Sequence, residues 1–252
     1  MISIKNQREI ECLRQGGKIL ARVLNTVMAA VRPGVSTQEL NDLAEKLILE
    51  AGAEPSFKNY QGFPAVLCTS VNDQVVHAIP RPDVIIRDGD IIGLDLGLWY
   101  KDLCTDMART VGVGRIPKES RRLIRVTERA LDKAIAQVSP GNRIGDISAA
   151  VQHWVESQGF SVVRSLFGHG VGYAVHEEPR IPNYGRPHTG PVLEIGMVLA
   201  IEPMVTAGHH EVHTAPDGWS ISTRDRSLAA HTEDTVVVTD DGCEILTKNS
   251  DG

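Results

Sequence analysis

Residues 87–97 read RDGDIIGLDLG, and residues 193–203 read LEIGMVLAIEP. Each segment places a carboxylate, Asp95 or Glu202, six residues after a glycine and near the end of an apolar run. A carboxylate among such residues is usually paired or bound to a metal ion, because an unpaired buried charge is costly. The two segments therefore predict equivalent strands, each carrying one acidic side chain into the protein interior.

Both segments belong to an internal repeat with an offset of 107 residues. Pro33-Gly34 recurs as Pro140-Gly141, and the apolar face of the helix expected after each pair recurs with it. The spacing i, i+3, i+4, i+7, i+8 of one helix face is met by Leu40, Leu43, Ala44, Leu47 and Ile48 and again by Ile147, Ala150, Val151, Trp154 and Val155. Two halves, about 1–113 and 114–252, are expected to pack about a pseudo-twofold axis that Asp95 and Glu202 both face. We expect them to form one catalytic domain, 1–252, because each half alone would leave a sheet edge open.

Helix and strand signals predict an α+β fold. Patterns that resemble capping boxes, Asn6 with Glu9 and Ser36 with Glu39, open the first two helices, and Gly52 ends the second. Further helices are expected over 118–138 and 146–157, and strands over 65–70, 75–79, 91–98, 103–113, 196–203 and 235–238. The stretches rich in Pro and Gly, 180–191 and 207–218, are expected to be surface loops. Helices precede strands within each half, which favours helices covering a largely antiparallel sheet.

Four carboxylates and one histidine form an oxygen-rich set of candidate metal ligands: Asp95, Asp106, His169, Glu202 and Glu233. Four carboxylates in one pocket repel one another unless cations neutralise them. A single divalent ion does not need such a set, whereas two ions bridged by carboxylates do. Asp106 lies eleven residues after Asp95, across a hairpin whose bend includes residues 99–101, so we expect the two carboxylates to face each other across neighbouring strands. The set predicts a two-metal hydrolase.

Three histidines lie in segments that suit a site around these carboxylates. His169 lies in GHGVG, where the flanking glycines allow close approach of the backbone, while His176 lies in HEEP and His77 in VVHAIP. HEEP is not HExxH, so a helix-borne zinc site of the metalloprotease kind is not supported. Another group lies in a predicted loop without carboxylate partners and is expected to be solvated: His209, His210 and His213.

Composition argues against several classes of protein. A net charge of −6 gives no electrostatic footprint for nucleic acid or for an anionic membrane surface. No apolar run approaches the roughly 20 residues of a membrane span. The polar start MISIKNQREI lacks the apolar core of a signal peptide. The four cysteines have no CxxC pairing, so we expect reduced thiols in a cytoplasmic protein.

Six segments resemble, in order and spacing, those of the bacterial-type type I methionine aminopeptidases: SVNDQVVHAIP, GDIIGLDLG, KDLCTDMART, FGHGVGYAVHEEP, GMVLAIEPMV and RDRSLAAHTEDTVVVTDDG. The resemblance covers about residues 4–246. It implies the pita-bread fold, whose pseudo-twofold symmetry agrees with the repeat. It also implies a cytoplasmic, monomeric enzyme that removes the initiator methionine from nascent chains at the ribosome. The resemblance implies that the second residue of the substrate is small and uncharged and that a deformylase removes the formyl group before this enzyme acts.

The resemblance also implies roles for the candidate ligands. Asp106 and Glu233 match the carboxylates that bridge two divalent ions, which would be Co²⁺, Mn²⁺, Fe²⁺ or Zn²⁺. Asp95 matches a ligand of one ion, and His169 and Glu202 match ligands of the other. Glu202 is in addition implied as the proton shuttle. The physiological metal stays open, because an oxygen-rich site with one imidazole suits all four ions.

Substrate contacts are implied in the same way. His77 and His176 match catalytic histidines that contact the substrate and stabilise the tetrahedral intermediate. The methionine pocket is matched by Tyr60, Phe63, Cys68 and Trp219, and aromatic rings with sulfur suit a thioether. Relatives often have a histidine where Gln61 stands and an aromatic residue where Val175 stands. These two departures predict a looser pocket.

Two other functions fit part of the sequence. Xaa-Pro peptidases share the pita-bread fold, but they usually carry an additional N-terminal domain, and only a short helical lead precedes Pro33. A non-enzymatic binding protein on the same fold would be favoured by loss of the ligands, yet all five are present.

Overall fold

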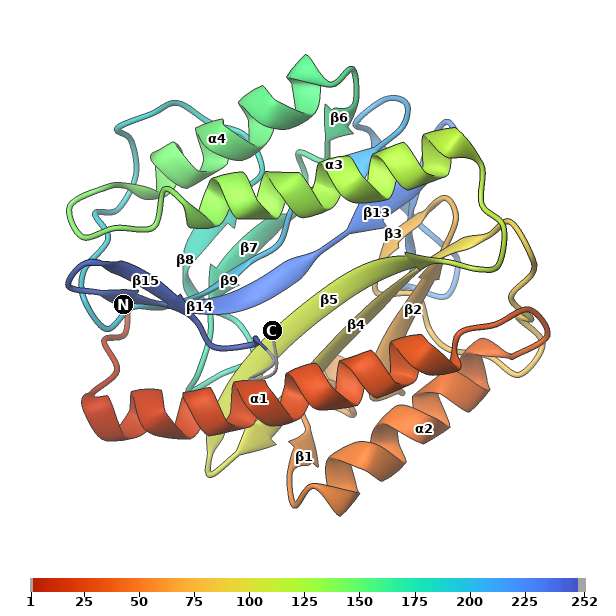
Figure 1. Cartoon of the computed structure of the whole chain (residues 1–252), viewed down its shortest axis with the longest axis horizontal. Coiled ribbons are helices and arrows are strands. Elements are labelled where there is room, and N and C mark those ends of the chain that lie inside the picture. The colour runs from red at the N-terminus through yellow and green to blue at the C-terminus, as the bar shows by residue number, and fades with distance from the viewer. Residues whose placement is uncertain (1, 249–252) are drawn as a thin grey trace.

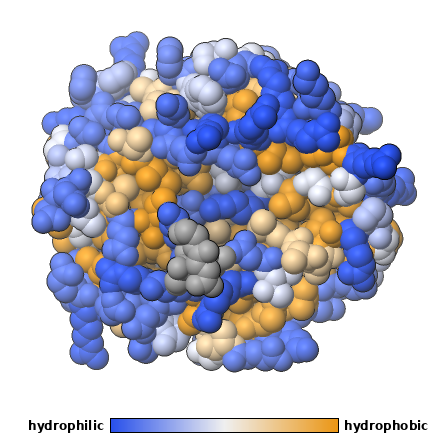
Figure 2. All heavy atoms as spheres, in the orientation of Figure 1, coloured by the Kyte–Doolittle hydropathy of each residue, from blue (hydrophilic) through white to orange (hydrophobic). Residues whose placement is uncertain are grey.

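Two pairs of helices cover one face of a nine-stranded sheet in the computed structural model, which describes residues 2–248 (Figure 1). The helices are α1 (Gln7–Ala30), α2 (Thr37–Glu50), α3 (Lys118–Ile135) and α4 (Ile144–Ser157), with a short 3₁₀ turn η1 at Tyr60–Gly62. None of the helices within 2–248 is both long enough and apolar enough to cross a bilayer. Hydrophilic side chains cover much of the face that the helices form, with apolar patches between them (Figure 2).

The large sheet has the order β1-β4-β5-β14-β9-β7-β8, with β2 added on β4 and β15 added on β14. Its strands are β1 (Glu54–Pro55), β2 (Leu67–Val71), β4 (Ile91–Tyr100), β5 (Leu103–Gly112), β7 (Phe167–Gly170), β8 (Glu177–Pro182), β9 (Val198–Ile201), β14 (Glu233–Thr239) and β15 (Gly242–Ile245). Two small sheets have the orders β13-β10-β6 and β11-β12-β3. Their strands are β3 (Gln74–Val76), β6 (Ser161–Val162), β10 (Met204–Thr206), β11 (Val212–Thr214), β12 (Ile221–Thr223) and β13 (Ala229–His231). Every strand pair is antiparallel, as the sequence predicted.

Local signals explain where the helices begin. The Asn6 side chain accepts the amide of Glu9 at 3.1 Å, and the Glu9 carboxylate accepts the amide of Asn6 at 2.8 Å, which confirms the capping box of α1. Ser36 and Glu39 confirm the second box in the same way. Helix α4 begins two residues before the predicted start, because the carboxylate of Asp146 caps the chain there by accepting the Arg143 amide at 2.7 Å.

The repeat recurs in the backbone itself. Helices α2 and α4 begin 107 residues apart, at Thr37 and Ile144. Glycines at the same offset have matching left-handed conformations, which side chains rarely adopt: Gly34 (φ +92°) with Gly141 (+88°), Gly52 (+70°) with Gly159 (+77°) and Gly89 (+96°) with Gly196 (+90°). The isolated bridges Ser36–Ile85 and Arg143–Val192 repeat at this offset too.

Strands from the two halves meet at the centre of the sheet. There β5 pairs with β14, and Glu233 lies opposite Ala108. Strand β4 flanks this central pair on one side and β9 flanks it on the other (Figure 1). Asp95 lies in β4 and Glu202 directly follows β9, so the two residues come from opposite sides of the central pair. Two large apolar clusters, one containing Leu20 under α1 and α2 and one containing Leu123 under α3 and α4, fix the helices on the sheet.

Three expectations need correction. The loop predicted over 207–218 contains strand β11, and the one predicted over 180–191 begins inside β8. Strand β11 forms because it pairs with β12, which in turn pairs with β3 from the first half, and tertiary pairing of this kind overrides local propensity. The hairpin turn lies at Lys101 and Asp102, both with positive φ, rather than at 99–101.

Candidate metal centre and substrate cavity

One cavity is lined by all five predicted ligands, which come from different strands. Asp95 lies within β4 and Asp106 within β5; His169 lies in β7, Glu202 directly follows β9, and Glu233 opens β14. Asp95 is paired with Ala108 and Asp106 with Gly97, so the two carboxylates are diagonal neighbours and not directly opposed as expected. The fold thus brings together residues that lie up to 138 positions apart in the sequence.

The candidate ligands are buried and close together. Ligand atoms of Asp106, His169 and Glu233 all lie within 4.8 Å of one another. The Nε2 atom of His169 lies 3.6 Å from Oε1 of Glu202. Asp95 is 8% exposed, and Glu233 is 2% exposed, so solvent screens little of the repulsion among the carboxylates.

Burial and mutual repulsion disfavour the charged carboxylates. Burial raises the pKa of Asp106 to about 7, with a further contribution from Glu202, and raises the pKa of Glu202 to about 8. Burial, followed by the charge of Asp106, also raises the pKa of Asp95 and that of Glu233 well above their usual range. Burial lowers the pKa of His169 to about 3, which leaves the imidazole neutral and able to bind a cation.

The donor atoms fit divalent metal ions. Oδ1 of Asp95 and Oε1 of Glu233 are buried and accept no hydrogen bond from any residue in 2–248. Buried polar atoms are rarely left unpaired, so these oxygens indicate a missing electropositive partner. Carboxylate oxygens with one imidazole are donors that Mn²⁺, Fe²⁺, Co²⁺ and Zn²⁺ accept.

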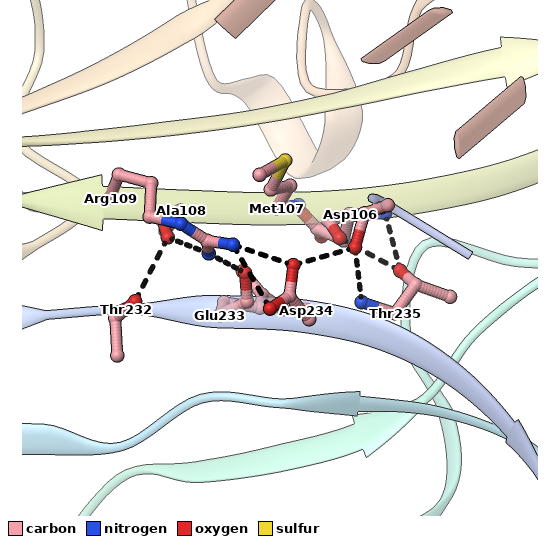
Figure 3. A network of polar contacts seen from close by, with 9 residues as sticks. Asp106, Met107, Ala108, Arg109, Thr232, Glu233, Asp234 and Thr235 are labelled. Atoms are coloured by element: carbon pink, nitrogen blue, oxygen red, sulfur yellow. Dashed lines mark hydrogen bonds and ion pairs between the residues drawn. The ribbon is translucent and has the colours of Figure 1, made fainter. Parts of the chain in front are cut away.

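A polar network fixes the strands that carry two of the ligands (Figure 3). Arg109 forms a two-pronged ion pair with Asp234, with N···O distances of 2.8 and 3.0 Å, and it also donates to the backbone carbonyl of Glu233. The Thr235 hydroxyl bonds both the amide and the carbonyl of Asp106. Sequence reasoning missed these three supporting residues, although the charges inside the DMART and TEDTVVV runs were a signal.

The two predicted substrate histidines line the same cavity. His77 follows β3 and has φ +59°, a left-handed conformation that is unfavourable for a side chain and often marks a functional position. Burial lowers its pKa to about 4. His176 lies 3.0 Å from the Tyr60 hydroxyl through Nδ1, and its ring centroid lies 4.3 Å from that of His169. Burial also lowers the pKa of His176.

An apolar end of the cavity is lined by the four predicted pocket residues, Tyr60, Phe63, Cys68 and Trp219, together with Phe57 and Gln61. Phe63 and Trp219 meet edge to face, with centroids 5.2 Å apart. Phe57 was not among the predicted pocket residues. Val175 is 1% exposed, packs in the apolar cluster that contains Phe57 and Phe63, and is not among the lining residues. Any effect of Val175 on the pocket is therefore indirect, whereas Gln61 lines it.

A second cavity adjoins the first and shares with it Gln61, His77, His169, His176 and Glu202. It continues past Phe167, Glu177 and Arg180. The two cavities give a site with an apolar end, a carboxylate cluster in the middle and a groove that leads away. An extended peptide could place one end residue in the apolar pocket and the rest of its chain in the groove.

His231 was also missed by the sequence reasoning. It is 3% exposed, and its Nε2 lies 3.2 Å from Oε2 of Glu202. Apart from this contact, Nε2 has no hydrogen-bond partner among the described residues. Glu202 therefore lies between two imidazoles, with one carboxylate oxygen facing His169 and the other facing His231.

The remaining histidines, and all the cysteines except Cys68, lie outside the two cavities. His209 and His213 are exposed and His210 is half-buried, as expected for solvated residues. His209 does have a carboxylate neighbour, contrary to expectation, because Glu211 approaches it to 3.9 Å on the surface. The four cysteines are free, and two of them, Cys68 and Cys104, are buried.

Known proteins resemble this chain over almost its whole length. The model of metallopeptidase family M24 matches residues 11–240. A methionine aminopeptidase from Clostridium perfringens is 50% identical over 247 residues, which cover 98% of this chain and 99% of that protein. The crystal structure of a methionine aminopeptidase from Thermotoga maritima matches with a TM-score of 0.97 and 43% identity, covering 99% of this chain and all of that one. A prolidase from Pyrococcus furiosus, with a TM-score of 0.79 and 24% identity, covers 98% of this chain and 66% of its own, and shows a shared fold alone. These matches confirm the pita-bread fold.

Proposed function

The chain belongs to metallopeptidase family M24 and is a methionine aminopeptidase of that family, and we propose that it removes the initiator methionine from nascent chains whose second residue is small and uncharged. The observation that carries this proposal is the buried carboxylate cluster between an apolar pocket and a groove. Such a site can hold the first side chain of a peptide, place the first peptide bond beside the carboxylates and let the remaining chain leave through the groove.

The enzyme uses divalent metal, and we propose two ions in each chain. Asp106 and Glu233 would bridge them, Asp95 would bind one, and His169 and Glu202 would bind the other. When bound, such ions polarise a carbonyl oxygen and lower the pKa of a water molecule. The unpaired oxygens of Asp95 and Glu233 support this assignment. Co²⁺, Mn²⁺, Fe²⁺ and Zn²⁺ all suit the donor set.

Glu202 is proposed to move the proton. Its carboxylate lines both cavities, and it is therefore within reach of a water molecule beside the first peptide bond. As a general base it would accept a proton from the attacking water, and as a general acid it would return that proton to the leaving amine.

His77 and His176 are proposed to stabilise negative charge on the carbonyl oxygen of the tetrahedral intermediate. Their lowered pKa values keep both rings neutral, so each ring has one N–H to donate. Because Nδ1 of His176 is engaged by Tyr60, its Nε2 is the atom that can face a substrate. Donors already in place for a developing oxyanion lower the barrier without reorganising in the transition state.

The apolar pocket is proposed to select methionine. Phe57, Phe63 and Trp219 offer aromatic surfaces to a thioether, and Cys68 adds a polarisable sulfur. A free α-amine would lie beside the carboxylate cluster. A formyl group on that amine would remove its basicity and its charge, so a deformylase must act first.

The cellular setting is proposed from this substrate. We place the enzyme in the cytoplasm, where it acts as a monomer on chains that emerge from the ribosome. Residues 1–252 are taken as one catalytic domain, because strands from both halves share the large sheet. Sedimentation of the purified protein at micromolar concentration tests the monomer, and a dimer would refute it.

Peptide hydrolysis tests the proposed reaction against its alternatives. The purified chain should release methionine from Met-Ala-Ser in the presence of Mn²⁺ or Co²⁺ and leave Ala-Pro-Gly intact. An Xaa-Pro peptidase would cleave Ala-Pro-Gly, and a binding protein would cleave neither peptide. Met-Lys and Met-Glu peptides should resist cleavage, and their efficient hydrolysis would contradict the requirement for a small second residue.

A further inference from the structure

The first residues of the described chain cross the loop that carries His176. We call Ile2–Asn6 the N-terminal strap and residues 171–177 the His176 loop. Within the strap, Lys5 has a fully buried side chain, and its Nζ lies 2.7 Å from Oε2 of Glu177. Ser3 binds the same carboxylate oxygen and also accepts a hydrogen bond from Lys5. The strap and the loop are thus joined by a charged contact that is largely shielded from water.

Glu177 uses its other oxygen to close the loop on itself. Oε1 accepts the backbone amides of Tyr173 and Ala174, the latter at 3.1 Å. The Lys5 ammonium also lies over the ring of Tyr173, 4.7 Å from its centroid. One carboxylate therefore fastens the loop internally through one oxygen and ties it to the strap through the other.

Two glycines let the strap approach. A Cβ atom at Gly172, where φ is +138°, would lie 2.5 Å from Cε of Lys5. A Cβ atom at Gly196 would lie 2.8 Å from the carbonyl oxygen of Lys5, whose amide donates to the carbonyl of Gly196 at 2.8 Å. The Lys5 stem thus runs over the backbone of the His176 loop at a place where a side chain would block it.

The loop in turn sets the position of His176. Among hydrogen bonds within residues 2–248, the His176 ring has one, to the Tyr60 hydroxyl. This hydrogen bond and the packing against the His169 ring leave the imidazole able to shift with its own backbone, so the loop supplies the remaining constraint. Backbone hydrogen bonds hold the start of the loop, at Val171 and Gly172, and the side chain of Glu177, the residue after His176, holds its end.

We propose that Ser3, Lys5 and Glu177 form a positioning unit that holds the His176 imidazole in place for the substrate carbonyl. These residues act through the loop and are not catalytic. The inference rests on the proposed function, because only a catalytic role of His176 requires its ring to be held precisely.

Variants of the pair test the positioning unit. Removing only one charge leaves its partner buried and unpaired, which can unfold a protein, so Lys5→Met is compared with the double variant Lys5→Met/Glu177→Gln. Glutamine keeps an oxygen that can accept the amides of Tyr173 and Ala174, while the charged contact with the strap is lost. Lys58→Met is the matched control, because it breaks a lysine–glutamate pair, with Glu45, that lies at the surface.

The readouts separate positioning from general damage. For the folded double variant we expect kcat on Met-Ala-Ser to fall about 10- to 100-fold, the range seen when supporting residues of an active site are removed. KM and bound metal should stay close to the wild-type values. Amide hydrogen exchange should speed up at Tyr173 and Ala174, because the loop that carries them loses its tie to the strap. Lys58→Met should match the wild type in all four measurements.

Two results would overturn the positioning role. One is a double variant with wild-type kcat and unchanged exchange in the His176 loop. The other is a loss of kcat that merely parallels loss of metal or of folded protein. In a further outcome, the wild type releases no methionine while amide exchange in the loop still rises in the double variant. The proposed function would then be wrong, but the conclusion that the strap holds the His176 loop would remain.

Discussion

Asp106 and Thr235 are joined by two hydrogen bonds across the centre of the sheet. The Asp106 amide donates to the Thr235 hydroxyl at 2.9 Å, and that hydroxyl donates to the Asp106 carbonyl at 2.7 Å. Asp106 comes from the first half of the chain and Thr235 from the second, so this contact joins the two halves (Figure 3). It fixes the backbone of a proposed bridging ligand relative to Glu233, two residues before Thr235.

Thr235→Val should weaken the fold and the metal centre together. Valine has a similar shape but leaves the buried amide and carbonyl of Asp106 without this partner, which costs about 1–3 kcal/mol. Denaturant unfolding of the metal-free protein measures the loss. Thr235→Ser keeps the hydroxyl and is the control; if serine and valine destabilise the protein equally, the hydrogen bonds are not the cause.

Asp106→Ala and Glu233→Ala should each remove most activity and one or both metals, since losing a bridging carboxylate uncouples the pair. His77→Ala should keep the metals and lower kcat, because His77 is assigned to the substrate. Metal analysis beside peptide kinetics checks all three variants. Near-normal turnover with full metal content in either carboxylate variant would overturn the bridging assignment, and metal loss in His77→Ala would overturn its role.

His231→Ala should disturb Glu202, because it removes the imidazole that faces Oε2. We expect activity or metal affinity to fall by about 10- to 100-fold, as is usual for groups that orient metal ligands. His231→Gln retains an N–H donor and should keep most of the activity and most of the metal affinity. Calorimetric titration with Mn²⁺ and peptide kinetics make the comparison, and an Ala variant that behaves like the Gln variant would contradict the orienting role.

Asp225 should make stability depend on acid pH. The nearby Ser227 side chain and the backbone amides of His209 and Ser227, which donate to the Asp225 carboxylate at 2.7 and 3.0 Å, lower the pKa of Asp225 to about 2. Because the folded pKa lies below the unfolded one, this stabilisation is complete above about pH 4 and is lost as pH falls through 2. For so exposed a group it amounts to at most about 1 kcal/mol. Urea unfolding of Asp225→Asn and wild type should therefore differ near neutral pH and converge in acid; a difference that persists below pH 2 would contradict this cause.

Gln61→His should sharpen selection of methionine over leucine or norleucine at the first position. Gln61 lines the apolar pocket, and one poorly filled subsite typically costs about 1–3 kcal/mol in discrimination. Ratios of kcat/KM for Met-Ala-Ser and Leu-Ala-Ser provide the test. Val175→Phe should not give this gain, because Val175 is packed behind the pocket and the larger ring would cost about 1–3 kcal/mol of stability. If the wild type and Gln61→His have equal kcat/KM ratios for the two peptides, another residue already fills the pocket beside Gln61 and this interpretation is wrong.

Features that repeat along the chain could be predicted from sequence. The capping residues and the turn glycines act locally, so Ser36 and Gly52 mark the ends of α2 directly. The offset of 107 residues then relates Asp95 to Glu202 before any strand pairing is known. The resemblance to a family supplied the roles of the candidate metal ligands, the two substrate histidines and the pocket residues. The structure places all of these side chains in one cavity.

Features that depend on which strands become neighbours could not be predicted. Thr235 supports Asp106 only because β14 pairs with β5, and strand β11 forms only because β12 lies beside it. His231 meets Glu202 through the pairing of β13 with β10. Lys5 reads as an ordinary surface lysine in the sequence, yet the fold buries it against Glu177. Each of these contacts joins segments that give no local sign of their partners.

Metal titration of the metal-free protein tests the central claim most directly. Chelator-treated protein receives Mn²⁺ in steps without oxygen, while bound ions and methionine release from Met-Ala-Ser are measured in the same samples. We predict no release without metal, release that rises with binding, a stoichiometry of two ions per chain in the wild type, and fewer bound ions in Asp106→Ala. Full turnover in protein that contains no metal, or unchanged binding in Asp106→Ala, would contradict a metal centre built on the buried carboxylates.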